Sequence, residues 1–161
     1  MGRRIVFLAV LLCGVATVSF AQLKTGALGL TTSFSENPNL GLAFAASENT
    51  RIAATVGFDF SHDSTGNSST YSFGLSLWRY VLTAESISNF FGGSVGFDAQ
   101  SNPFGTSSSI DLAALYGAEY WFSKRFAVHG TLQIHFDTGR SLGSTVTGIF
   151  TSAEAGLTWY L

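Results

Sequence analysis

The sequence predicts an all-β fold: an eight-stranded antiparallel up-and-down transmembrane β-barrel. Three observations lead to this prediction. Hydrophobic residues make up 46% of the 161 residues and charged residues only 11%, well below the roughly 25% of a typical soluble domain. Glycine (18) and phenylalanine (15) are abundant, which is typical of strands and turns. Apolar and small polar residues alternate with a period of two along most of the chain, which is the pattern of strands.

The start of the chain has the pattern of a cleaved signal peptide. A basic beginning, an apolar stretch over 5–18 and small residues up to Ala21 fit cleavage before Gln22. The apolar stretch is shorter than the roughly 20 residues that a spanning helix needs. We therefore expect two parts, a signal peptide over 1–21 and a barrel domain over 22–161.

The composition of the mature part excludes several function classes. Its only cysteine, Cys13, falls in the signal peptide, so we expect no disulfide, no thiol chemistry and no cysteine-based metal site. Six basic and ten acidic side chains remain, a net charge of −4, which gives no basic patch for nucleic acid. We expect no cofactor and no metal. Without a long apolar run, the only way for this part to span a bilayer is a closed barrel, because hydrocarbon satisfies no backbone hydrogen bond.

Eight segments alternate well enough to be predicted as strands. In the third, Ile52, Ala54 and Val56 point one way while Arg51 and Ala53 point the other. Polar loops are expected over 62–70, 100–109 and 138–144, and the stretch 81–89 fits either a connection or longer strands. The expected strands are 23–34, 40–46, 51–61, 71–77, 91–98, 110–122, 126–137 and 149–161.

The distribution of charges and aromatic residues favours a barrel in lipid. The face opposite the apolar one is mostly Gly, Ser, Thr and Ala, which suits a narrow interior. All charges at strand positions lie on that face: Arg51, Asp59, Asp98, Asp111, Glu119, Asp137 and Glu154. A charge on the lipid face would cost about 2–4 kcal/mol at mid-membrane. Aromatic residues near the strand ends predict two interfacial belts, one of them containing Trp78, Tyr80, Phe90, Phe91, Tyr120, Phe122, Phe126 and Trp159.

Interior charges need partners, because an unpaired buried charge is costly. We expect an ion-pair cluster drawn from Arg51, Arg79, Glu119 and Glu154. It either fastens the interior or acts as a proton or ion gate.

A second polar cluster is expected near the other end of the barrel. It consists of Asp59, His135 and Asp137. His135 and Asp137, together with His62, Asp63 and loop serines, could supply the nucleophile, base and orienting group of a hydrolase, although the sequence does not fix their geometry.

The last strand carries the resemblance to a known family. Leu157, Trp159 and Leu161 alternate on one face, with Tyr160 beside the end. With the signal peptide and eight strands, this resembles the small outer-membrane barrel superfamily, which includes the OmpA barrel domain, OmpX-type barrels and opacity-type proteins. The resemblance implies a place in the bacterial cell envelope, contact with outer-membrane lipid, and recognition of the last strand by the barrel-assembly machinery. The family ends in an aromatic residue, whereas this chain ends in Leu161.

These observations predict an outer-membrane protein with a structural or surface-interaction role. No open pore is expected, because eight strands leave room for side chains only. Short turns around Ser47 and Ser123 and longer loops at the opposite end predict that both termini are periplasmic. We expect no enzymatic activity. The alternatives are a lipid-modifying enzyme similar to lipid A deacylases and a soluble, lipocalin-like barrel for a small ligand.

Overall fold

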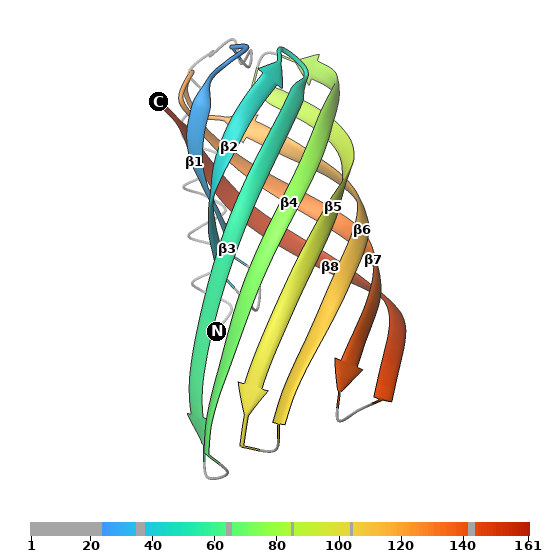
Figure 1. The fold of residues 1–161 in the computed structure, drawn as a ribbon. Helices are drawn as coiled ribbons and strands as arrows, with labels where there is room; N and C mark the ends of the chain where they lie inside the picture. The colour runs from blue at the N-terminus through green and yellow to red at the C-terminus, as the bar shows by residue number, and fades with distance from the viewer. Residues whose placement is uncertain (1–23, 35–37, 64–65, 85, 104, 142–143) are drawn as a thin grey trace, which may run out of the picture.

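The computed structural model describes residues 24–34, 38–63, 66–84, 86–103, 105–141 and 144–161. The predicted signal peptide, 1–21, lies outside the described residues. Eight strands form one closed antiparallel sheet, in which each strand pairs with the next and β1 pairs with β8 (Figure 1). This confirms the predicted fold. The strands are β1 (Leu28–Phe34), β2 (Asn39–Ser47), β3 (Thr50–Asp63), β4 (Gly66–Ala84), β5 (Ile87–Asn102), β6 (Gly105–Trp121), β7 (Phe126–Ser141) and β8 (Ser144–Tyr160).

The two ends of the barrel differ. We call one the terminal end, because β1 starts there and β8 ends there, beside the β2–β3, β4–β5 and β6–β7 connections. It is at the top of Figure 1, where the C-terminus is marked. We call the other the hairpin end, because the long β3–β4, β5–β6 and β7–β8 hairpins close there, at the bottom of Figure 1.

Alternation along the strands separates an apolar outside from a polar inside. Leu112 on β6 and Ile134 on β7 are 52% and 60% exposed, whereas their neighbours Ala113 and Gln133 are buried. The predicted facing of both strands is therefore correct. A soluble barrel needs a hydrated outer face, so this arrangement argues against the lipocalin-like alternative.

The apolar outer face forms a band with polar residues beyond it. On β4 the outward residues Tyr71, Phe73, Leu75 and Leu77 are all exposed. Ser69 and Arg79 continue the same face beyond the two ends of this run. A tilted strand crosses the hydrocarbon with about 9–11 residues, so the longer strands extend past a membrane of ordinary thickness.

The predicted long loops are wrong, because the strands continue through them. β3 reaches Asp63 and pairs it with Gly66, and β5 pairs Asn102 with Gly105. Gly66 and Gly105 have φ values of 132° and 147°, which glycine adopts at little cost. The apolar alternation stops in these segments because both faces are polar there, although the backbone pairing goes on.

Two other boundaries differ from the prediction. Residues 24–27 form a turn in which the Ala27 N–H donates to the Lys24 carbonyl at 2.9 Å, so β1 starts later than expected. The ambiguous stretch 81–89 belongs to lengthened strands, with an irregularity in the pairing between Tyr80 and Leu82. The described residues contain no helix that is long and apolar enough to cross a membrane.

Candidate functional site

The interior is divided into two unlike halves along the barrel axis. Large side chains fill the half nearest the terminal end, and we call them the plug. The half nearest the hairpin end contains a cavity of about 650 Å³, which we call the vestibule. The plug consists of Thr31, Arg51, Trp78, Tyr80, Phe90, Glu119, Trp121, Thr158 and Tyr160.

An ion pair lies at the centre of the plug. Arg51 Nη1 donates to Glu119 Oε1 at 2.9 Å, and both side chains are buried. Tyr80 donates its hydroxyl to the other oxygen of Glu119 at 2.6 Å, and Arg51 Nη2 donates to Thr31 Oγ1 at 2.9 Å. Thr31 in turn shares a hydrogen bond with Thr158 at 3.1 Å. This network links β1, β3, β4, β6 and β8 across the lumen, so it fastens strands that are not neighbours in the sheet.

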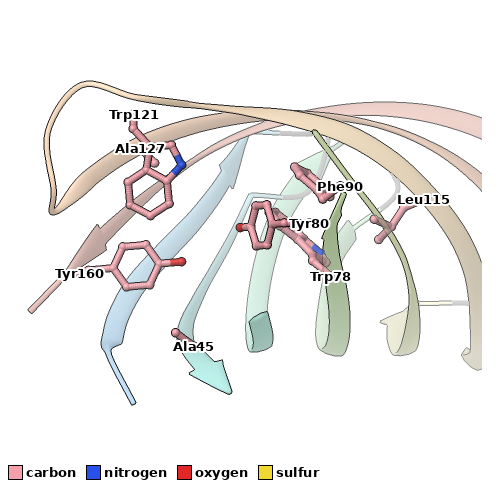
Figure 2. Packing of buried hydrophobic residues seen from close by; sticks show 8 residues of the cluster. All are labelled: Ala45, Trp78, Tyr80, Phe90, Leu115, Trp121, Ala127 and Tyr160. Carbon is pink, nitrogen blue, oxygen red and sulfur yellow. The ribbon is translucent and has the colours of Figure 1, made fainter. Parts of the chain in front are cut away.

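Aromatic rings make up much of the plug, and Figure 2 shows five of them, from Trp78, Tyr80, Phe90, Trp121 and Tyr160. Trp78 stacks on Phe90 with ring centroids 4.1 Å apart, and the Arg51 guanidinium carbon lies 4.0 Å from the Trp78 ring centroid. Trp121 stacks on Tyr160 at 5.4 Å. The cation over the Trp78 face gains further electrostatic attraction, because both groups are buried. All four of these stacked rings are buried in this half of the lumen.

Two glycines make room for the packing of the plug. A Cβ at Gly117 would overlap the Phe90 ring, and one at Gly156 would overlap the His129 ring. His129 is buried and meets Trp78 edge-on at 4.8 Å. The small residues of the inner face therefore allow large residues on neighbouring strands to reach the barrel axis.

The vestibule is polar and acidic. Four carboxylate residues from β5, β6, β7 and β8 line it: Asp98, Asp111, Asp137 and Glu154. Among the described lining residues Arg51 is the only Lys or Arg, and its charge already faces Glu119. We therefore expect the vestibule to repel anions and attract neutral or cationic solutes.

A chain of three hydrogen-bonded side chains crosses the vestibule wall. His135 on β7 contacts Asp111 on β6 through Nδ1 (2.8 Å to Oδ2) and Ser152 on β8 through Nε2 (2.7 Å to Oγ). The His135 ring also stacks on Phe150 at 4.5 Å, with an angle of 2° between the planes. Because a carboxylate only accepts, Nδ1 donates to Asp111, and neutral His135 then accepts the Ser152 hydroxyl proton at Nε2.

The structure places the four residues expected in the ion-pair cluster at three different locations. Arg51 and Glu119 form the ion pair. Arg79 does not join them: its neighbours Trp78 and Tyr80 point inward, so Arg79 points outward, where it donates to Thr50 Oγ1 at 3.0 Å. Glu154 lies in the vestibule and accepts from Gln133 Nε2 at 2.7 Å. The prediction for Arg79 is therefore wrong, because strand alternation puts it on the other face.

The three residues expected near the other end are not brought together. His135 and Asp137 both line the vestibule, but Asp59 is exposed on β3 and is not part of its wall. The carboxylate that contacts His135 is Asp111, not Asp59 or Asp137. Asp111 is the diagonal neighbour across the β6–β7 pair, whereas Asp137 is two residues further along the same strand.

Several aromatic residues expected in an interfacial belt belong to the interior. Trp78, Tyr80 and Phe90 are buried in the plug. Their positions continue the inward alternation of Ser76 on β4 and Gly92 on β5, which is the signal that could have identified them. At the end of β8, Trp159 is 58% and Leu161 76% exposed, whereas Tyr160 is buried against Trp121.

Within the described ranges, no group of three or more His, Cys, Asp or Glu side chains is arranged to hold a metal ion.

A closed eight-stranded barrel with an apolar outside and a largely polar inside defines the class of small transmembrane β-barrels. Neither a family model nor a curated protein matches the sequence. Among solved structures, the chain is similar to the N-terminal β-barrel domain of Pseudomonas aeruginosa OprF, with a TM-score of 0.59 and 12% identity over 85% of this chain and 98% of that one. The attachment invasion locus protein Ail of Yersinia pestis matches with a TM-score of 0.41 and 10% identity over 84% and 94%. The similarity to the OprF domain shows that the chain has the fold of a small outer-membrane barrel.

Proposed function

We propose that this protein is an outer-membrane barrel without an open pore, with a structural or surface-interaction role. The observation that carries the proposal is the combination of an apolar outer band with a lumen that large buried side chains occupy in its terminal half. A bilayer accepts the first, and the second supports a barrel without an open pore. In this proposal the terminal end faces the periplasm and the hairpin end faces outward.

The hairpin end is the part suited to surface contact. Its strands extend beyond the apolar band, and their outward residues there are polar, for example Asn67, Ser69, Ser108 and Arg140. In small outer-membrane barrels the longer connecting segments face the outside, and such segments are where binding functions concentrate. Here the parts of the strands that extend beyond the apolar band take the place of long loops. The same orientation puts the alternating end of β8 in the periplasm, where the assembly machinery would recognise it.

Membrane insertion is tested by extraction and by gel mobility. We expect the protein to stay in outer membranes washed with carbonate or urea, and the unboiled protein to migrate differently from the boiled one. Release by the wash would contradict the proposal, since a barrel with an apolar outer face cannot leave lipid for water.

Orientation can be tested with single cysteines, because the chain from Gln22 onward contains none. Ser144→Cys lies at the hairpin end and Lys124→Cys at the terminal end, and both positions are exposed. On intact cells a membrane-impermeant maleimide should label Ser144→Cys only, and permeabilised cells should allow labelling of both. The opposite result on intact cells would overturn the proposed orientation.

Closure is tested by electrical recording in planar bilayers. The unmodified protein should carry little current. The double variant Trp78→Ala, Phe90→Ala removes the stacked pair and should raise the conductance, whereas Trp159→Ala, on the outer face, should not. A large stable current through the unmodified protein would contradict a closed barrel.

A further inference from the structure

The strongest unexplained feature of the interior is the hydrogen-bonded chain of Asp111, His135 and Ser152. The three residues come from adjacent strands, and both ring nitrogens of His135 are engaged, at 2.8 and 2.7 Å. The Asp111 carboxylate holds the ring in the tautomer whose Nε2 faces a hydroxyl. This arrangement supplies a nucleophile, a base and an orienting group in the order that nucleophilic serine catalysis requires.

We infer that Ser152 is a reactive nucleophile that attacks small neutral or cationic esters entering the vestibule. His135 is its base, and Asp111 is the residue that positions the base. This inference departs from the expectation of a protein without enzymatic activity, because the register of β6, β7 and β8 supplies the geometry that the sequence alone leaves open.

The vestibule provides the space and access that such a reaction needs. Its volume of about 650 Å³ is within the range of roughly 300–1,000 Å³ of small-molecule sites. His135 and Asp111 both line it and keep 13% and 16% of their side-chain surface exposed, so they are neither sealed off nor free in bulk water. The carboxylates of Asp98, Asp137 and Glu154 in the same wall disfavour an anionic substrate.

The chemical step balances without any further reactant than water. Ser152 Oγ forms a bond to the ester carbonyl carbon while its proton passes to His135 Nε2. The bond from that carbon to the leaving oxygen breaks, and the Nε2 proton passes to the leaving alkoxide. A water molecule then gives a proton to Nε2 and attacks the acyl carbon, which releases the acid and restores the Ser152 hydroxyl.

Stabilisation of the oxyanion is the weak part of this site. The main chain around Ser152 and His135 is engaged in strand pairing, so its N–H groups are poor candidates for oxyanion donors. The Gln133 amide already donates to Thr131 and Glu154, at 3.1 and 2.7 Å. Loss of a single oxyanion donor costs a serine hydrolase about 10²–10³ in rate. We therefore expect slow turnover, and the sharper readout is covalent capture of the serine.

The experiment uses the full mature chain, folded in detergent micelles and checked by its shift on boiling. A neutral alkyl fluorophosphonate is added, and the adduct is located by peptide mass spectrometry. We expect one adduct, on Ser152, that is absent from Ser152→Ala and from boiled protein. His135→Gln should slow labelling by about 10²-fold or more, the contribution of a positioned base, and Asp111→Asn should slow it as well.

Ser94→Ala is the matched control. Ser94 lines the same vestibule but is not part of the hydrogen-bonded chain, so this variant should be labelled at the original rate. Absence of an adduct from folded protein would overturn the inference, as would labelling of Ser152 that His135→Gln leaves unchanged. Either result leaves the barrel proposal intact, because the boiling shift reports on that separately.

The substrate class is tested with three nitrophenyl esters of equal acyl length that carry a positive, a zero or a negative charge. Initial rates that depend on Ser152 should be highest for the cationic or neutral ester. Preference for the anionic ester would overturn the assignment of substrate charge.

Discussion

The ion pair of Arg51 and Glu119 makes a strong prediction about stability. Glu119→Gln removes the negative charge but keeps the volume of the side chain and an acceptor for the Tyr80 hydroxyl. The guanidinium of Arg51 then stays buried without a counter-charge, although it keeps its contacts with Thr31 and the Trp78 ring. Because a buried charge without a counter-charge is unfavourable, we expect a large loss of stability from this isosteric change.

The size of the effect follows from the distance and the burial. Two unit charges 2.9 Å apart attract each other by about 6 kcal/mol at an effective dielectric constant of ~20. Removing one partner of a buried pair costs about 3–5 kcal/mol in measured cases. With a urea dependence of about 2 kcal/mol per molar, the unfolding midpoint should fall by about 2 M.

The assay is equilibrium unfolding in urea with the protein refolded in lipid vesicles. Tryptophan fluorescence reports on the plug because Trp78 and Trp121 belong to it. The double variant Arg51→Met, Glu119→Gln removes both charges and should recover most of the loss, since replacing a whole buried pair is often neutral. Arg79→Met, which removes an exposed arginine, should stay within about 0.5 kcal/mol of the original protein.

Two results would refute this reasoning. One is a cost below about 1 kcal/mol for Glu119→Gln, which is the value of an exposed pair. The other is a double variant as unstable as the sum of the two single changes, since contacting groups should not act additively.

Three further predictions follow from the packing and the outer face. Gly156→Val should push the His129 ring aside and lower the stability by about 1–3 kcal/mol. Gly148→Ala should leave the stability unchanged, since nothing lies within 4 Å of an added Cβ there. The same urea titration measures both variants, and equal effects would contradict the described packing. Leu112→Arg should cost about 2–4 kcal/mol and Ser108→Arg about 0–1, because only the first lies in the apolar band; a reversed order would contradict the proposed position of the membrane. Trp159→Ala should slow assembly in cells, which can be measured by pulse labelling and the gel shift on boiling, whereas refolding of the purified variant should remain efficient. An unchanged assembly rate in cells would argue against recognition of the end of β8 by the assembly machinery.

The fold was predictable because one physical rule acts on almost every residue. In a narrow barrel in lipid, alternate positions face hydrocarbon or the lumen, so a charge such as Asp111 identifies the direction of its whole strand. Beyond Leu77 the same rule assigns Arg79 to the outside and Trp78 to the inside. At this end of β4 the strand period therefore outweighs the general preference of aromatic residues for membrane interfaces.

The contacts between strands were harder to predict, because they depend on register. Arg51 and Glu119 are 68 residues apart, and no local pattern states how far along the axis each one lies. The same holds for Ser152, whose position beside His135 depends on the stagger of β8 against β7. A shift of two residues would keep every side chain on its face and still separate the two groups by about 7 Å. The sequence pattern therefore predicts whether a side chain faces the lumen or the outside, whereas its position along the barrel axis depends on how whole strands pair.

The plug and the reactive serine together make a prediction about sidedness. In the closed barrel that we propose, Arg51, Trp78 and His129 form the floor of the vestibule. We therefore expect a solute to enter and leave at the hairpin end, which faces outward in the proposed orientation. A cationic, membrane-impermeant fluorophosphonate added to intact cells should therefore label Ser152 as completely as it does in permeabilised cells. In the variant Trp78→Ala, Phe90→Ala, a probe trapped in the periplasm should gain access as well. Labelling of the unmodified protein only after permeabilisation would mean that the vestibule opens to the periplasm or that the floor does not separate the two sides.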